Sequence, residues 1–517
     1  MAALYGTVRG CTTQKEATFN TGSTFGGIVG QVYTEASISD CRNYADLKPN
    51  STSAGEYAGI AGKTSDKSNG VVISHCENHG NITSKNYTAG ICSRVLAGVK
   101  VEDCVNYGTI TSTGSSYTGG IVASLAATKA DYPVVGAYRC INYGNVNGFT
   151  SYIGGIAGEL GTSSEVDSCL NYGNITSQAT SSHLAVGGVT GVVRGNLTRC
   201  LNAGHINSVG HGTGGVTGLV QSGSIDRCAN LGNVTSTGQF PSSGNKNGMV
   251  GGIVGYTVNA AKVYNCYNTG DLTGPLNMGG LIARANANFD IPLEHCYTAG
   301  KLTVTGSDED PVSANLYVRN SGTNVVWKNI YYNSDVNPTS YSYDPGNRGR
   351  SAVDLQNVEL SDEFVKTRAM LPRLSWLAGN DAADMAAISL SYSKSEDNAG
   401  NINDIFYVGY PKDGLTWELS PELRMSVSDP GKVYPVKLGA ATIKVSTPDG
   451  KFTRTFNLTV NKTSDVNELG LDGAAPVRVD YYDMQGLRIE KPAQGMLVIE
   501  RAVYEDGTVT TTKKIMP

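Results

Sequence analysis

The feature that most constrains the fold of this chain is a cysteine that recurs at one position of an internal repeat. The interval is 28 residues between Cys76 and Cys104 and 38 residues between Cys228 and Cys266. Repetition at such a period is the signature of a solenoid, in which each unit stacks on copies of itself. The cysteines at this position are Cys11, Cys41, Cys76, Cys104, Cys140, Cys169, Cys200, Cys228, Cys266 and Cys296.

Two short motifs alternate along the repeats. The first surrounds the cysteine and reads Cys104-Val-Asn-Tyr-Gly108 in one copy and Cys140-Ile-Asn-Tyr-Gly144 in the next. The second is glycine-rich, as in Gly26-Gly-Ile-Val-Gly30 and Gly251-Gly-Ile-Val-Gly255. The alternation continues to about residue 335, where Trp327-Lys-Asn-Ile-Tyr-Tyr332 reads as the final coil.

The composition favours strands over helices in these repeats. Short Val and Ile segments are separated by Gly, Ser, Thr and Asn, and no apolar stripe of period 3.6 is visible. The chain has 64 glycines, which permit tight corners, and only 16% charged residues. We therefore predict a parallel β-solenoid of about ten coils over residues 1–335, with two or three strands in each coil.

The repeat cysteines are predicted to form a buried structural ladder of free thiols rather than disulfides. One cysteine per coil at one register stacks along the axis, where the Cβ directions of neighbours suit bridging poorly. A buried thiol also packs as a small apolar side chain. Zinc is not expected, because the sequence has no CxxC pair. The predicted ladder consists of Cys41, Cys76, Cys104, Cys140, Cys169, Cys200, Cys228, Cys266 and Cys296.

An asparagine follows most repeat cysteines two residues later, as in Asn106, Asn142 and Asn171. A side-chain amide in each coil can hydrogen-bond its copies above and below, or cap the following turn. We predict a structural asparagine ladder, with a polar ligand-binding row as the alternative.

The next position along carries aromatic side chains in consecutive repeats. If this position faces outward, the rings form a strip that can stack on sugar rings; otherwise it is a packing ladder without a ligand. The strip fades at Ala203. The candidate ligand-binding residues are Tyr44, Tyr107, Tyr143 and Tyr172, with His79 in the same row.

The sequence offers no catalytic, metal or cofactor motif. HExxH, G-x-S-x-G and P-loop patterns are absent, and the dense acidic run Ser307-Asp-Glu-Asp310 reads as a loop rather than a calcium site. Polysaccharide lyases and glycosidases on β-helices need converging carboxylates, whereas the acidic residues here are scattered. We therefore expect a protein that is not an enzyme and that needs no cofactor.

The charge pattern and the hydropathy indicate which classes of partner to expect. The net charge is −5 without a basic cluster, so nucleic acid is not an expected partner. No apolar run is long enough to span a membrane, and we expect a monomer. Residues 1–6 lack a signal pattern and read as the middle of a repeat, so we expect an export signal upstream of them.

Four segments follow the solenoid. Residues 336–384 are predicted to be a linker with a capping helix within 360–377, where Ser361 caps the first turn and Pro372 breaks the helix. This helix would cover the open end of the solenoid. Residues 385–462 have the short alternating strands of a β-sandwich, 463–477 form a linker, and 478–517 form a last β segment.

The alternating Gly-Gly-Ile-Val-Gly and Cys-x-Asn-Tyr-Gly text resembles the GLUG repeats of bacterial surface proteins, including adhesin-like proteins. Residues 385–462 resemble a bacterial Ig-like domain of group 2. The text Tyr481-Tyr-Asp-Met-Gln-Gly-Leu-Arg488 is similar to the C-terminal sorting tails of exported Bacteroidetes proteins, although Met484, Leu487 and Met496 depart from the pattern.

These resemblances imply export by a Gram-negative bacterium and display at the outer-membrane surface or release from the cell. We expect an adhesin-like protein whose long repeat surface binds a glycan or a host protein. A carbohydrate-active β-helix enzyme and a purely structural stalk remain the alternatives.

Overall fold

The computed structural model describes most of the chain, which forms two compact units, Met1–Ser389 and Leu390–Pro517. The described residues are 1–17, 23–48, 55–96, 98–114, 117–127, 135–149, 152–178, 185–238, 248–259, 261–275, 277–285, 290–305, 314–319, 324–339, 346, 348–396, 402–460, 477–483, 487–503 and 509–516.

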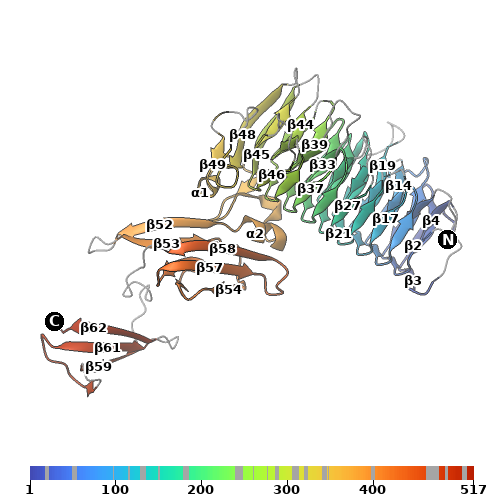
Figure 1. The fold of residues 1–517 in the computed structure, drawn as a ribbon. Helices are drawn as coiled ribbons and strands as arrows, with labels where there is room; N and C mark the ends of the chain where they lie inside the picture. Colours follow the sequence, from blue (N-terminus) through green and yellow to red (C-terminus); the bar gives the residue numbers. More distant parts are fainter. Residues whose placement is uncertain are drawn as a thin grey trace. The chain divides into compact units, whose positions relative to one another are not determined.

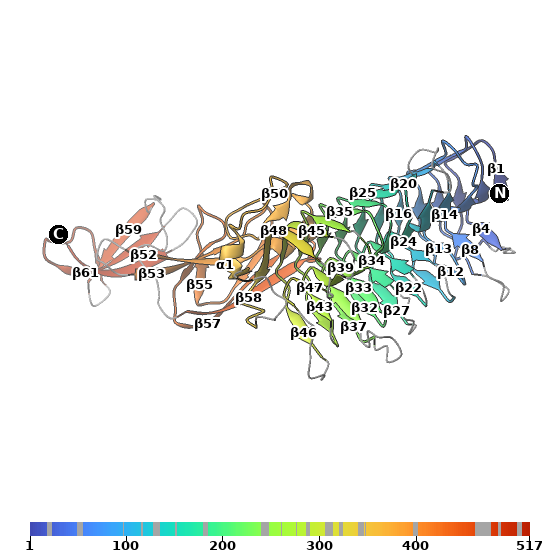
Figure 2. The same ribbon diagram turned by 90° about the horizontal axis from the view of Figure 1, so that it is seen from above.

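The first unit is a parallel β-solenoid in which every full coil crosses four sheets (Figures 1 and 2). Sheet A has 11 strands and includes β5 (Val29–Val32), and sheet B has 21 short strands and includes β6 (Ser37–Ser39). Sheet C has nine strands and includes β4 (Thr24–Gly26), and sheet D has eight and includes β12 (Ile82–Ser84). The parallel β-solenoid is confirmed, and the stack is close to the expected ten coils.

The expectation of two or three strands per coil was too low. Most solenoid strands are two to five residues long, because glycine corners and left-handed residues bend the chain after a few residues. One such corner joins sheets C and A at Gly27, where an added Cβ would lie 2.3 Å from the Gly59 carbonyl oxygen. The same Cβ would lie 2.6 Å from Asn43 Oδ1. Only glycine therefore fits at this corner.

The two largest apolar clusters of the solenoid lie on opposite sides of the coils. The larger lies between sheets A and B and contains the repeat cysteines with residues such as Val29 and Ile38. The smaller lies between sheets C and D and contains residues such as Val146 and Ile153. Neighbouring coils pair in register, so each core residue stacks on its copies; for example, Ile38 pairs with Ile73. This in-register stacking repeats every outward-facing position as a straight row.

The residue before each repeat cysteine adopts the left-handed conformation. Its φ is 54° at Asp103 and 51° at Arg139, and it divides sheet B into two short strands, such as β20 (Val135–Tyr138) and β21 (Ile141–Asn142). Such a conformation costs about 1–2 kcal/mol for a residue with a Cβ. Its recurrence shows that the stacked coils enforce the kink. The non-glycine examples are Asp40, His75, Asp103, Arg139, Ser168, Arg199, Arg227, Asn265 and His295.

The stack ends with β48 (Val325–Asn333) and β49 (Gly349–Arg350), and the following segment contradicts the predicted capping helix. Residues 360–377 contain β50 (Phe364–Val365), β51 (Arg373–Leu374) and the 3-10 turn η1 (Ser375–Leu377). Among the described residues of the unit, α-helices lie only outside this range, as α1 (Ala352–Leu355) and α2 (Asp381–Ala387).

Tertiary contacts explain why the capping signals at Ser361 fail. Phe364 packs against Tyr267 and Tyr297, and the guanidinium of Arg373 forms a buried ion pair with Asp384. We refer to residues 361–388 as the strap. The strap lies on the outer face of sheet B instead of covering the open end of the solenoid.

The second unit is built from antiparallel sheets. Strands β52 (Leu390–Glu396), β53 (Ile402–Val408), β56 (Lys432–Pro435) and β55 (Leu423–Met425) form one sheet, and β54 (Thr416–Leu419), β57 (Gly439–Ser446) and β58 (Thr453–Val460) form another. Two antiparallel sheets are what a β-sandwich requires. A separate sheet follows, with β59 (Arg478–Tyr482), β60 (Arg488–Ile489), β61 (Leu497–Val503) and β62 (Val509–Ile515). Most of the predicted 463–477 linker lies outside the described residues.

Candidate recognition face on sheet B

The outer face of sheet B carries three parallel rows of side chains. The kink row is the left-handed residue before each cysteine, the middle row is the residue after it, and the aromatic row is the residue after the asparagine. The middle row runs Arg42, Glu77, Val105, Ile141, Leu170, Leu201, Ala229, Tyr267 and Tyr297. The aromatic row is Tyr44, His79, Tyr107, Tyr143 and Tyr172.

Two interior ladders hold these rows in register. Asn106 Nδ2 donates to Asn142 Oδ1 at 2.8 Å and to the Gly108 carbonyl oxygen at 2.9 Å, and the pattern recurs from Asn43 to Asn268. The thiol of Cys104 donates to the Glu102 carbonyl oxygen at 3.2 Å. All the cysteines are free, and only Cys11 is exposed. Burial raises the pKa of the off-register Cys92 thiol.

The predicted aromatic residues do lie together on the outside of the solenoid. Tyr44, Tyr107 and Tyr143 are 38%, 47% and 44% exposed. The rings stack on one another along the axis, with centroids 4.6 Å apart for Tyr44 and His79 and 5.4 Å apart for Tyr107 and Tyr143. Within the row, each ring therefore covers the faces of its neighbours. Mainly ring edges and hydroxyl groups remain for a ligand, which suits hydrogen bonding better than face stacking on a sugar.

The middle row is covered at one end and open at the other. Leu201, Ala229, Tyr267 and Tyr297 are fully buried, whereas Val105, Ile141 and Leu170 are partly exposed. The strap supplies the cover, because Phe364 packs on Tyr267 and Tyr297, which stack on each other at 5.3 Å. The sequence had a signal for this second aromatic pair, since tyrosine directly follows Cys266 and Cys296.

The strap bonds to the other two rows as well. Trp376 Nε1 donates to the carbonyl oxygen of Arg227 in the kink row at 3.0 Å, and Asn380 Nδ2 donates to the hydroxyl of Tyr172 in the aromatic row at 2.8 Å. Burial, the larger effect, raises the pKa of Tyr172. The strap thus lies on the outer face of sheet B from the coil of Cys296 back to that of Cys169. We refer to the part of the three rows from Tyr44 to Leu170 as the bare face, which stops at Tyr172, where the strap bonds.

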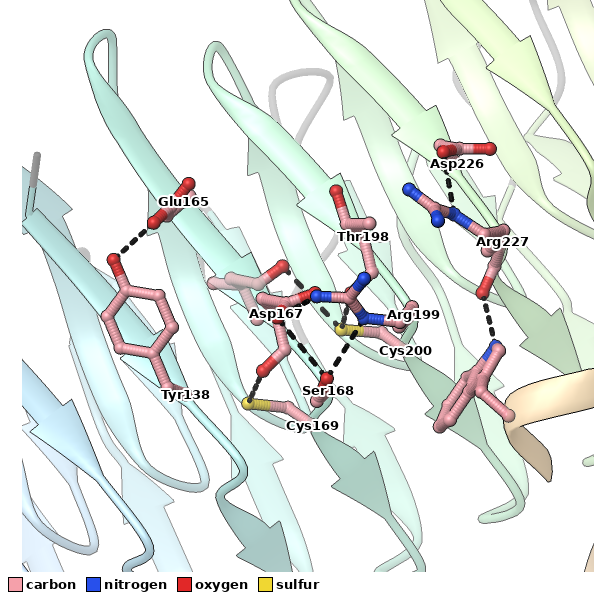
Figure 3. Close-up of polar contacts among 12 residues, drawn as sticks. Tyr138, Glu165, Asp167, Ser168, Cys169, Thr198, Arg199, Cys200, Asp226 and Arg227 are labelled. Carbon is pink, nitrogen blue, oxygen red and sulfur yellow. Dashed lines mark hydrogen bonds and ion pairs between the residues drawn. The ribbon is translucent and has the colours of Figure 1, made fainter.

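Charged side chains of the kink row pair with one another or with adjacent residues. Arg139 bonds Asp103 at 2.7 Å and Glu102 at 3.2 Å, and its hydrogen bond lowers the pKa of Asp103. Figure 3 shows the same pattern further along, where Arg199 lies against Asp167 and Ser168. The bare face therefore carries little uncompensated charge.

A second set of paired charges joins sheets A and C. Glu56 lies 2.8 Å from Arg94 and 3.0 Å from Lys63. Burial alone would raise the pKa of Glu56, but these two hydrogen-bonded cations outweigh it and the pKa is lowered. The carboxyl groups of Glu56, Glu77 and Asp103 in the solenoid all have a lowered pKa. A glycosidase acid needs a raised pKa, so these carboxylates suit ion pairing rather than proton donation.

The described part of the chain contains no group of three or more His, Cys, Asp or Glu residues placed to hold a metal. The acidic run 307–310 lies outside the described residues. No helix in the described ranges is long and apolar enough to cross a membrane.

Comparison with known proteins identifies the repeat type. Residues 246–273 match the family model described as the GLUG motif. No curated protein and no solved structure matches the chain. The matched stretch holds one glycine-rich corner and one cysteine motif, including β39 (Val254–Thr257) and β41 (Tyr267–Asn268). The chain is thus a β-solenoid repeat protein that carries a GLUG motif.

Proposed function

We propose that this chain is a secreted or surface-displayed adhesin-like binding protein of a Gram-negative bacterium of the Bacteroidetes type. Its elongated solenoid presents the bare face to a glycan or to a host or other extracellular protein. The Ig-like and sorting roles of the two C-terminal segments belong to the same proposal and rest on sequence resemblance.

The observation that carries the proposal is the unequal cover of the middle row. In the C-terminal coils the chain buries Tyr267 and Tyr297 under Phe364 of its own strap, as is usual for an apolar outer row. In the N-terminal coils the equivalent residues Val105 and Ile141 stay partly exposed beside the exposed tyrosines. Contiguous exposed apolar and aromatic side chains on a rigid surface are typical of interaction sites.

The pairing of carboxylates supports binding over hydrolysis. A retaining or inverting glycosidase needs one protonated and one ionised carboxyl group on either side of a bond. Asp103 and Glu56 are each held ionised by an arginine, which leaves neither available as an acid near neutral pH.

The test is a glycan and matrix-protein array probed with the full chain, with product analysis of the same glycans. We expect saturable binding without cleavage, lost in a Tyr107→Ala/Tyr143→Ala variant. Tyr5→Ala is the matched control, because Tyr5 is 70% exposed and also stacks on a neighbour, Tyr33. Released oligosaccharide would instead make the chain an enzyme, and neither binding nor product would leave a structural stalk.

A further inference from the structure

We infer that the partner of the bare face is a polypeptide segment that binds as the strap does, and this inference rests on the proposed function. The bare face and the strap-covered face are one continuous surface, made of the same three rows in the same register. The contacts that the strap makes with the covered face therefore indicate which kind of ligand the bare face can bind.

The strap uses one feature of each row. It donates a hydrogen bond to the carbonyl of a kink-row residue, Arg227, and it places an aromatic ring, Phe364, on the middle row. It also donates a side-chain amide to an aromatic-row hydroxyl, that of Tyr172. All three contacts are ones that a polypeptide supplies.

The bare face repeats these three features. Arg227 presents its carbonyl from the left-handed conformation, with φ of 54°, and Ser168 has the same conformation with φ of 57°. Leu170 and Ile141 continue the apolar middle row, and the hydroxyl of Tyr107 continues the aromatic row.

The spacing of the strap contacts defines the segment. Trp376 bonds the coil of Cys228 and Asn380 bonds the coil of Cys169, two coils away. Two coil steps span about 10 Å at the spacing of paired strands. The equivalent pair on the bare face is the carbonyl of Ser168 and the hydroxyl of Tyr107. The partner segment should therefore carry an aromatic residue with a ring N–H and, about four residues away, a side-chain amide.

Two observations favour a polypeptide over a glycan here. The rings of the aromatic row cover one another, with 10° between the planes of Tyr107 and Tyr143, so sugars find few free ring faces. The flanking charges are paired, as for Arg139 with Asp103, so an anionic polysaccharide gains little by electrostatic attraction.

The experiment selects random dodecapeptides displayed on phage against the immobilised full chain, and then measures Kd for the enriched peptides. We expect enriched sequences with tryptophan and asparagine or glutamine about four residues apart. Ile141→Lys should weaken them more than tenfold, because it places a charge on the apolar row. Tyr107→Phe should weaken binding of the enriched peptides about fivefold, because one hydrogen bond is lost. This variant keeps the ring stacking, so it still tests the inference if Ile141→Lys misfolds. Tyr5→Phe is the control that should leave Kd unchanged.

Peptides that bind equally well to the Ile141→Lys and Tyr107→Phe variants would overturn the inference, as would the absence of any enriched peptide. In the latter case, glycan binding that requires Tyr107 and Tyr143 would retain the proposed function and reject only the polypeptide partner. Absence of both peptide and glycan or matrix-protein binding would reject the two together.

Discussion

Asn106 and Asn142 lie on successive coils, and the side-chain amide of the first donates to the side-chain oxygen of the second at 2.8 Å. Both side chains are fully buried. The same nitrogen of Asn106 also bonds the Gly108 carbonyl, so one residue type satisfies a turn and joins two coils. This bond, repeated through the solenoid, keeps the outer rows straight.

Replacing Asn142 with alanine should destabilise the solenoid by about 3 kcal/mol. The change removes the acceptor of Asn106 and the donor to the Gly144 carbonyl, and buried polar groups without partners cost about 1–3 kcal/mol each. Urea unfolding measures the effect. Asn207 is exposed in β32 (Ile206–Ser208), and Asn207→Ala should cost less than about 0.5 kcal/mol. Equal effects of the two substitutions would contradict the ladder.

The thiols should differ sharply in reactivity. The chain has 11 cysteines, and Cys11 alone is exposed. Titration of the native protein with a disulfide reagent should modify Cys11 only, and denaturation should release the others, because the reagent cannot reach buried thiols. Mass spectrometry identifies the modified site. Rapid modification of Cys104 or Cys169 in the native protein would show that the core between sheets A and B is open.

The stability of the solenoid should depend on pH through Glu56. Its pKa is lower in the folded protein than its ordinary value of 4.5, so the unfolded chain binds the proton first as the pH falls. Ionised Glu56 therefore contributes about 1 kcal/mol to the free energy of unfolding above about pH 5. This contribution is lost as the pH falls through the pKa of Glu56 in the folded protein. Glu56→Gln should be less stable than the wild type at pH 7, and the difference should shrink as the pH falls through the folded-state pKa of Glu56. The exposed Glu16→Gln serves as control, and a gap that widens in acid would contradict the ion pair.

Removing the main apolar anchor of the strap should release the strap. Phe364 packs against Tyr267 and Tyr297 and is only 8% exposed. Truncation of a buried Phe costs about 3–5 kcal/mol. Phe364→Ala should increase hydrogen exchange across 361–388 and leave residues 98–114 unchanged. Phe149 is 46% exposed, and Phe149→Ala should alter neither region. Unchanged exchange in the strap would mean that other contacts hold it.

The sequence was sufficient to predict the solenoid because the evidence for it is local and repeated. Cys104, Asn106 and their copies recur at one register, and in-register stacking follows directly from that recurrence. The repeat left open whether Tyr107 faces outward or forms a packing ladder, and the structure shows that it is exposed.

The strap could not be predicted, because its conformation depends on residues far away in the chain. Ser361 and the acidic residues after it favour a helix locally, but Trp376 bonds Arg227 and Asn380 bonds Tyr172, 149 and 208 residues away. Such contacts override local preference. The division of sheet B into two short strands in each coil was missed for a related reason, since non-glycine residues such as Arg139 take the left-handed conformation only when stacked neighbours enforce it.

Tyrosine nitration of the full chain, mapped by mass spectrometry, tests the central claim most directly. The claim is that the outer face of sheet B is bare in its N-terminal coils and covered by the strap in its C-terminal coils. We predict nitration of Tyr44, Tyr107 and Tyr143, which are exposed, and none of Tyr267 and Tyr297, which are fully buried. Protection of Tyr107 and Tyr143, or modification of Tyr267 and Tyr297 to the same extent, would contradict the account.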